Sequence, residues 1–157
     1  MNTKVLLVGA GPIGIEMAIA LKRSAIDYYH VEAGCLAATI AWYAPGTAFF
    51  SSPERLSLAG VPFETSPHYK ATREDYLHYL RSVVKQFELE IHSYTKLTEV
   101  KKLGERFRCE LKASTHGVGG PEESEEISIN GETSNKSTEL IAEKLILALG
   151  DMHLPRK

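Results

Sequence analysis

The sequence predicts an α/β fold in which a small antiparallel sheet is inserted into a Rossmann-like parallel sheet. Residues 3–31 follow the order strand, glycine turn, helix, strand, which is typical of a βαβ unit. Residues 96–113 alternate apolar and polar positions on either side of a Leu-Gly-Glu turn, which indicates an antiparallel hairpin. Residues 145–149 form a further apolar run, typical of a buried parallel strand. The 157 residues are ample for one core and marginal for two, so we expect a single domain.

The composition is that of an ordinary globular chain. Hydrophobic residues make up 43% and charged residues 24%, and the net charge of −2 gives no support for binding nucleic acid or an anionic membrane. The longest apolar runs are far shorter than a membrane span, and the first strand begins at residue 3, which leaves no room for a signal peptide. Cys35 and Cys109 form neither a Cys-x-x-Cys pair nor a metal-ligand cluster, so we expect no metal and a reduced, cytoplasmic compartment.

The turn after the first strand has the spacing Gly-x-Gly-x-x-Gly. Gly9 lets the backbone leave the strand sharply, Gly11 places no Cβ against a pyrophosphate, and Gly14 lets the helix pack closely on the strand. Glu32 follows Gly14 by 18 positions, where a carboxylate is suited to accept hydrogen bonds from ribose hydroxyls. A glycine turn without a ligand is the alternative, but three such glycines weaken local structure unless close approach is needed. The pattern predicts a dinucleotide site with the pyrophosphate at the helix N-terminus.

The segment after the second strand has few signals of regular structure. Residues 35–42 fit one or two helical turns, and Ala44-Pro45-Gly46 is a turn signal. Residues 47–67 have the length of a functional loop or a disordered segment, and their aromatic residues argue against disorder. We therefore expect an irregular but ordered region.

A second helix and a third parallel strand are expected next. Thr72 is a candidate N-cap, with Asp75 at the matching position of a capping box. The helix extends to about Phe87, and residues 89–92 form the third parallel strand after a right-handed crossover.

The composition changes after residue 113. Residues 114–137 are rich in glycine and glutamate, so we expect a flexible acidic insertion at the surface, with a short strand at Ile127 and Ile129. Leu140 and Ile141 are placed to close the small antiparallel sheet.

Residues 5–34 resemble the amino-terminal flavin-binding segment of flavoproteins that have two dinucleotide-binding domains. The consensus of that segment has Ala four residues after the third glycine and Leu three further on, and Ala18 and Leu21 match it. Ala25 stands where a glycine is usual before the second strand.

Two further stretches sharpen this resemblance. Residues 39–63, which include Phe-Phe-Ser-Ser-Pro-Glu at 49–54, are similar to the bacillithiol-disulfide-reductase-like, thioredoxin-reductase-related group, which also takes in flavin-containing monooxygenases. Residues 145–150 resemble the Ala-Thr-Gly strand that closes the FAD domain of these enzymes, with Leu149 in place of Thr.

The sequence departs from the family pattern in two ways. Bacillithiol-reductase-like proteins carry a Cys between the Pro and the third Gly of the turn, whereas this chain has Ile13, so a thiol role there is unsupported. The families continue into an NAD(P)H-binding domain that is absent from residues 1–157. The resemblance therefore implies an incomplete FAD-binding domain.

The resemblance implies FAD as the cofactor, and NAD(P)H as the electron donor of the complete enzyme. It places the backbone near Leu97 against adenine, Thr39, Ile40 and Trp42 toward the flavin ring, and residues 148–151 near the pyrophosphate. The expected cofactor-binding residues are Gly9, Gly11, Pro12, Ile13, Gly14, Glu32, Ala33, Thr39, Ile40, Trp42, Leu97, Ala148, Gly150 and Asp151. The alternatives are that Leu97 is a core residue of the hairpin and that Trp42 is a plain core anchor.

Two classes of function stay open at this stage. The first is the FAD-binding part of an NAD(P)H-dependent flavin oxidoreductase, in which hydride passes from NAD(P)H to FAD and then to an unknown acceptor. The second is a non-catalytic nucleotide-binding module or a truncated subunit, and NAD at the same site is a further alternative. An exposed sheet edge would favour either a homodimer or aggregation.

No residue is assigned a catalytic role. We expect Cys35 to be an inert buried thiol, Cys109 to lie in the core and His30 to be a hydrogen-bonded core residue.

Overall fold

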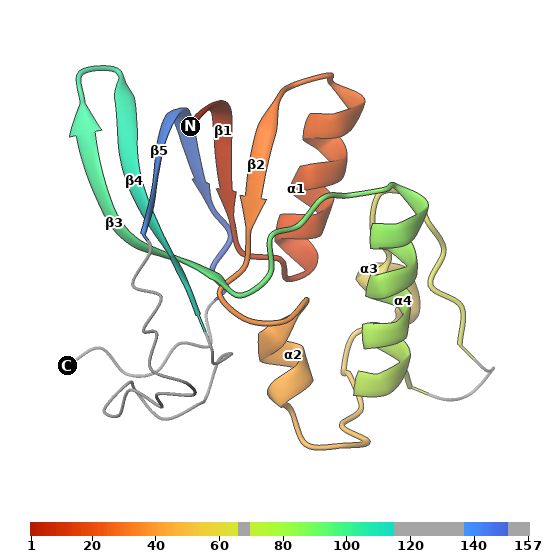
Figure 1. The fold of residues 1–157 in the computed structure, drawn as a ribbon. Helices are drawn as coiled ribbons and strands as arrows, with labels where there is room; N and C mark the ends of the chain where they lie inside the picture. The colour runs from red at the N-terminus through yellow and green to blue at the C-terminus, as the bar shows by residue number, and fades with distance from the viewer. Residues whose placement is uncertain (66–69, 115–136, 151–157) are drawn as a thin grey trace, which may run out of the picture.

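One mixed five-stranded sheet, in the order β2-β1-β5-β4-β3, forms the centre of the fold (Figure 1). The computed structural model describes residues 1–65, 70–114 and 137–150. The elements are β1 Asn2–Val8, α1 Pro12–Arg23, β2 Tyr28–Val31, α2 Ala38–Trp42, α3 Pro53–Leu56, α4 Arg73–Gln86, β3 Thr95–Leu103, β4 Arg106–Ala113 and β5 Thr138–Leu147. The predicted α/β fold with parallel and antiparallel strands is confirmed.

β5 joins the parallel and antiparallel parts into one continuous sheet. Its residues from Thr138 to Ala142 pair antiparallel with β4, and those from Ile141 to Leu147 pair parallel with β1. The expected strand at 145–149 is therefore the second half of a longer strand. Leu147 is 55% exposed rather than buried, because β4 pairs with β5 only as far as Ala142 and no longer flanks it there.

The expected third parallel strand is reduced to one isolated bridge between Val31 and His92. Glu88 and Tyr94 both have positive φ, so the backbone bends away from an extended path on either side. The N–H of Leu89 also still donates to Val84 O, 3.0 Å away, at the end of α4. The prediction of a strand over 89–92 was wrong because these local conformations leave little extended chain to pair.

The two faces of β1 are buried by different parts of the molecule. Val5 and Leu7 belong to the main hydrophobic cluster, together with residues of α1 and α4. Leu6 and Val8 belong to a second cluster, together with residues of β4 and β5. Burial on both faces explains why this strand is a continuous apolar run. Figure 1 shows α1 beside β1 and β2, and α2 near the carboxyl ends of these strands.

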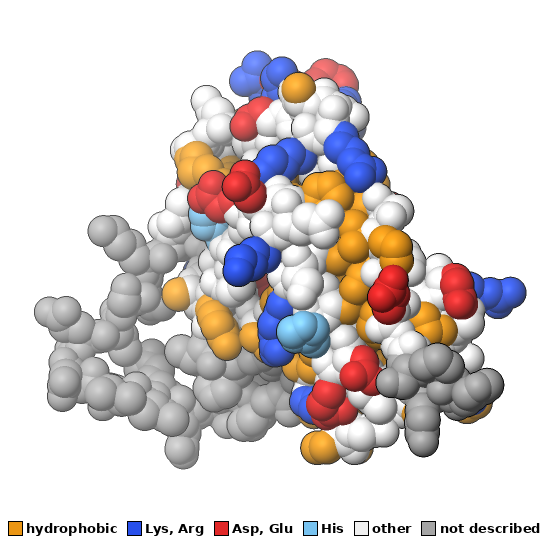
Figure 2. Space-filling model, turned by 90° about the vertical axis from the view of Figure 1, so that its right-hand side faces the viewer, with side chains coloured by type: hydrophobic (Ala, Val, Ile, Leu, Met, Phe, Trp, Pro, Cys, Tyr) orange, Lys and Arg blue, Asp and Glu red, His pale blue; other side chains and the backbone are white. Residues whose placement is uncertain are grey.

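The irregular segment up to residue 65 is ordered by aromatic contacts with α4, as the sequence predicts. Phe63 packs on Tyr79 and Tyr76, with ring centroids 4.6 and 5.4 Å apart. The Tyr79 hydroxyl accepts a hydrogen bond from the Leu58 N–H and donates one to Val61 O, both at 2.7 Å. On the side of α4, Figure 2 shows a band of hydrophobic side chains that reach the surface among charged ones.

Helix α4 begins as predicted. The Thr72 hydroxyl accepts a hydrogen bond from the Asp75 N–H, and the Asp75 carboxylate accepts one from the Thr72 N–H, which completes a capping box.

Among the described helices, none has the length and apolar character needed to cross a membrane. The expected acidic insertion at 114–137 lies, apart from its end residues, outside the described part of the chain.

Candidate dinucleotide-binding site

The glycine turn lies at the carboxyl end of β1, and two of its glycines are required by the fold itself. Gly9 has φ +102°, and a Cβ on it would overlap the carbonyl oxygen of Ala148. A Cβ on Gly14 would overlap the carbonyl oxygen of Gly9, because the first turn of α1 packs directly on the turn. These positions therefore need glycine for close backbone packing.

Gly11 is different, because the fold does not require a glycine there. It is the N-cap of α1 with φ −76° and ψ −176°, a conformation open to any residue. A Cβ added to it meets nothing within 4 Å. The space in front of Gly11 is open, as a bound pyrophosphate would require.

The N-terminus of α1 is suited to an anion. No acidic residue lies in its first turn, and Lys22 and Arg23 lie in its last turn. The first-turn amides of Ile13 and Gly14 have no carbonyl partner within the helix, so they are available to an anionic ligand together with the positive end of the helix dipole.

Glu32 holds the turn from the end of β2. Glu32 is only 8% exposed. Its carboxylate accepts hydrogen bonds from the Ala10 N–H at 2.7 Å and from the Gly34 N–H at 2.8 Å. A carboxylate has about four lone-pair sites, so two such bonds leave capacity for ribose hydroxyls. The acid thus both braces the turn and lines the adjacent pocket.

A pocket of about 480 Å³ adjoins the turn. Its volume lies within the range of roughly 300–1,000 Å³ that is usual for small-molecule and cofactor sites. The expected residues that line it are Gly9, Gly11, Pro12, Ile13, Glu32, Ala33, Thr39, Ile40, Ala148 and Gly150. Residues far apart in the sequence therefore meet where the resemblance places a cofactor.

Three of the expected residues that the structure describes do not line this pocket. Gly14 is buried beneath the turn. Trp42 is 61% exposed at the end of α2, so the alternative that it anchors the core was wrong. Leu97 packs on the second hydrophobic cluster, which agrees with the alternative that it is a core residue of the hairpin. Asp151 lies outside the described residues.

Residues from the irregular segment and α4 complete the pocket, and the sequence alone did not identify them. These residues are Tyr43, Phe49, Arg55, Leu56, Leu58 and Tyr76. The Tyr76 hydroxyl donates to Leu56 O at 3.1 Å, and burial raises the pKa of Tyr76. The aromatic content of residues 47–63 was the available signal, but it carried no information on which side chains face the ligand.

Cys109 and His30 lie in the core as expected, whereas Cys35 does not. Cys109 is fully buried in the second cluster, and burial raises the pKa of its thiol. Cys35 is partly exposed rather than buried. His30 is buried and its Nε2 lies 2.8 Å from Gly9 O, which confirms a hydrogen-bonded core residue. Among the described residues, no group of His, Cys, Asp and Glu side chains could hold a metal.

The fold and the glycine turn are those of dinucleotide-binding α/β proteins. A family model described as pyridine nucleotide-disulphide oxidoreductase matches residues 6–117, and the chain belongs to this family.

Two reductases are among the proteins to which the chain is similar. Bacilliredoxin reductase Bdr of Bacillus subtilis is 37% identical over 86 residues, which cover 55% of this chain and 26% of that protein. The structure of bacillithiol disulfide reductase Bdr from Staphylococcus aureus aligns with a TM-score of 0.73 and 26% identity, covering 96% of this chain and 39% of that one. The chain thus spans well under half the length of these relatives.

A monooxygenase shares the fold alone. A steroid monooxygenase bound to NADP aligns with a TM-score of 0.73 and 21% identity, over 96% of this chain and 26% of that chain.

Proposed function

We propose that this chain is the FAD-binding part of an NAD(P)H-dependent flavin oxidoreductase. The observation that carries the proposal is Gly11, which the fold leaves free to carry a side chain and which faces open space at the N-terminus of α1. A glycine there is explained by a ligand that approaches the backbone closely. Membership of the pyridine nucleotide-disulphide oxidoreductase family supports a dinucleotide as that ligand.

The residues of the pocket suggest how FAD would be held. The amides at the start of α1 would bind the pyrophosphate, and Glu32 would accept hydrogen bonds from the adenosine ribose. Thr39 and Ile40 would lie toward the flavin ring, where Phe49 and Tyr76 add an apolar, aromatic surface. This extended apolar part of the pocket favours FAD over NAD, because a flavin ring is larger and less polar than a nicotinamide.

When bound, FAD supplies the hydride and electron-transfer chemistry, while the protein supplies binding and orientation. In the whole protein we propose NAD(P)H as the donor and leave the acceptor unassigned. Ile13 lies in the turn where bacillithiol-reductase-like proteins carry a Cys, so no thiol step is proposed at this position.

An absorption titration tests the proposal. The purified chain is titrated with FAD and separately with NAD⁺, and flavin absorbance and fluorescence are followed. We expect saturable binding of FAD and much weaker binding of NAD⁺. NADPH is then added without oxygen, and we expect the bound flavin to stay oxidised, because the proposed residues form one dinucleotide site. A chain that takes up no FAD, or that prefers NAD⁺, would overturn the proposal.

A further inference from the structure

Three consecutive residues, the last two of β2 and Glu32 directly after it, contact the first two peptide groups of the glycine turn. Val31 O accepts a hydrogen bond from the Gly9 N–H at 2.8 Å. Glu32 Oε2 accepts one from the Ala10 N–H at 2.7 Å. His30 Nε2 lies 2.8 Å from Gly9 O. The carbonyl and both amides at the entry to the turn are therefore fixed from one strand.

The contact of His30 defines its tautomer. A carbonyl oxygen only accepts hydrogen bonds, so Nε2 must carry the hydrogen and donate it to Gly9 O. His30 is 1% exposed, and its buried Nδ1 has no hydrogen-bond partner in the described part of the chain. Burial also lowers the pKa of the imidazole. A neutral ring with its hydrogen on Nε2 therefore leaves no buried N–H group without an acceptor.

The carbonyl that His30 holds is also the one against which α1 packs. Gly14 approaches Gly9 O so closely that a Cβ would overlap it, so this carbonyl fixes where the helix begins. A rotated Gly9–Ala10 peptide would move the oxygen away from His30 and displace the amides of the first helical turn. A turn that samples such states binds a ligand more weakly, in proportion to the fraction that is correctly shaped.

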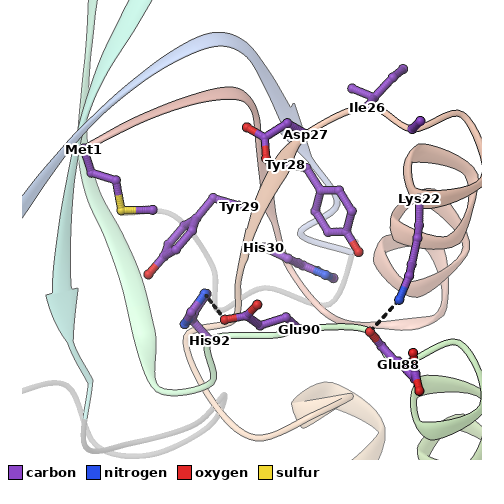
Figure 3. Close-up of a pocket in the computed structure, with 11 residues that line it drawn as sticks. Met1, Lys22, Ile26, Asp27, Tyr28, Tyr29, His30, Glu88, Glu90 and His92 are labelled. Atoms are coloured by element: carbon purple, nitrogen blue, oxygen red, sulfur yellow. Dashed lines mark hydrogen bonds and ion pairs between the residues drawn. The ribbon is translucent and has the colours of Figure 1, made fainter.

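We propose that His30 is a positioning residue for the dinucleotide, in which the neutral imidazole fixes the Gly9 carbonyl and so presets the phosphate-binding turn. The inference rests on the proposed function, because it assigns the turn to a bound dinucleotide. His30 does not line the pocket beside the turn. It lies instead at the edge of a second cavity of about 640 Å³, among Tyr28, Tyr29 and His92 (Figure 3).

The test compares three substitutions in the chain. His30→Leu keeps the volume but removes the donor. His30→Gln restores an amide N–H at about the reach of Nε2. Thr3→Val is the matched control, since Thr3 is also buried and its hydroxyl donates to Val5 O at 3.1 Å, away from the turn. The dissociation constant for FAD and the thermal midpoint are measured for each.

We expect His30→Leu to weaken FAD binding about fivefold to tenfold, the value of one hydrogen bond, while His30→Gln stays within about twofold of the parent. Thr3→Val should lower the thermal midpoint without changing FAD affinity. Equal affinity for His30→Leu and the parent would overturn the inference, as would a loss in Thr3→Val as large as that in His30→Leu.

A second measurement keeps the inference separate from the proposed function. Nitrogen-15 NMR of the parent chain without cofactor reports the His30 tautomer directly, and we expect a protonated Nε2 and a bare Nδ1. A different tautomer would overturn the role of His30 even if FAD binds and even if His30→Leu fails to fold. If the expected tautomer is found but the parent binds no FAD, the proposed function fails, and the positioning of a dinucleotide fails with it.

Discussion

Gly11 and Gly14 lie three residues apart and are glycines for different reasons. Gly14 faces the Gly9 carbonyl, so the packing of α1 on the turn excludes a side chain there. Gly11 faces open space with an ordinary backbone conformation, so the folded chain alone would accept a side chain. The same motif thus combines glycines that packing requires with one glycine that only the proposed ligand would require.

Replacing Gly14 with Ala should destabilise the fold. The new Cβ would force the backbone of α1 away from the turn, at a cost of about 3 kcal/mol in the free energy of unfolding. Gly11→Ala is the matched control, and we expect a change within about 0.5 kcal/mol because its Cβ enters open space. Urea unfolding measures both. Similar losses for the two variants would contradict the distinction.

The pH dependence of stability should carry the signature of buried His30. Because burial lowers the pKa of His30 in the folded chain, the unfolded chain binds its proton first as the pH falls. Stability is therefore complete above about pH 6.5 and declines below it, down to the lowered folded pKa. The charges that face the ring are Glu32, which favours protonation, and His92, which opposes it.

The comparison that isolates His30 is the parent chain against His30→Gln. The other histidines are common to both chains, so their titrations cancel. We expect the stability of the parent, relative to that of the variant, to fall between pH 7.5 and pH 5 in urea unfolding experiments. A constant difference across this range would show that His30 is not held neutral by burial.

At the scale of elements, α4 shapes the pocket through side chains that reach into the irregular segment. The hydroxyl of Tyr79 bonds to the Leu58 N–H and to Val61 O, and that of Tyr76 bonds to Leu56 O. Leu56, Leu58 and Tyr76 also line the pocket. The helix therefore positions a wall that has little regular structure of its own.

Tyr79→Phe should loosen that wall. The substitution leaves the buried Leu58 N–H without its acceptor, and we expect a loss of about 2 kcal/mol in the free energy of unfolding. Amide hydrogen exchange should accelerate first around residues 57–61. Tyr94→Phe removes the same hydroxyl from an exposed side chain and should change stability by less than about 0.5 kcal/mol. Equal effects of the two variants would contradict this role for α4.

At the scale of the whole molecule, the βαβ unit and the start of α4 could be predicted because their signals are local. The apolar run of β1, the glycine spacing and the capping box of α4 each lie within a few residues of the element they define. The continuous apolar run of β1 also predicted that both of its faces are buried. The structure agrees, because Val5 and Leu6 belong to different hydrophobic clusters. Short-range patterns of this kind need no knowledge of partners.

The features that depend on distant partners could not be predicted. β5 pairs in opposite senses with β4 and β1, and no local pattern marks the change at Ala142. The third parallel strand does not form because Glu88 and Tyr94 have positive φ. Neither Glu nor Tyr is a residue type that predicts this conformation from the sequence. The same holds for the pocket wall, where Arg55 of α3 lines the pocket together with residues of the glycine turn that lie far from it in the sequence.

The central claim is that the open space at Gly11 is the binding site of a dinucleotide, and isothermal titration with FAD tests it most directly. The parent chain is compared with Gly11→Val and with Ala113→Val, which adds a similar branched side chain at an exposed strand position. We expect saturable binding at one site in the parent and the control, and no measurable binding in Gly11→Val, with similar thermal midpoints for all three. FAD binding that is undiminished in Gly11→Val, or absent from the parent, would contradict the claim.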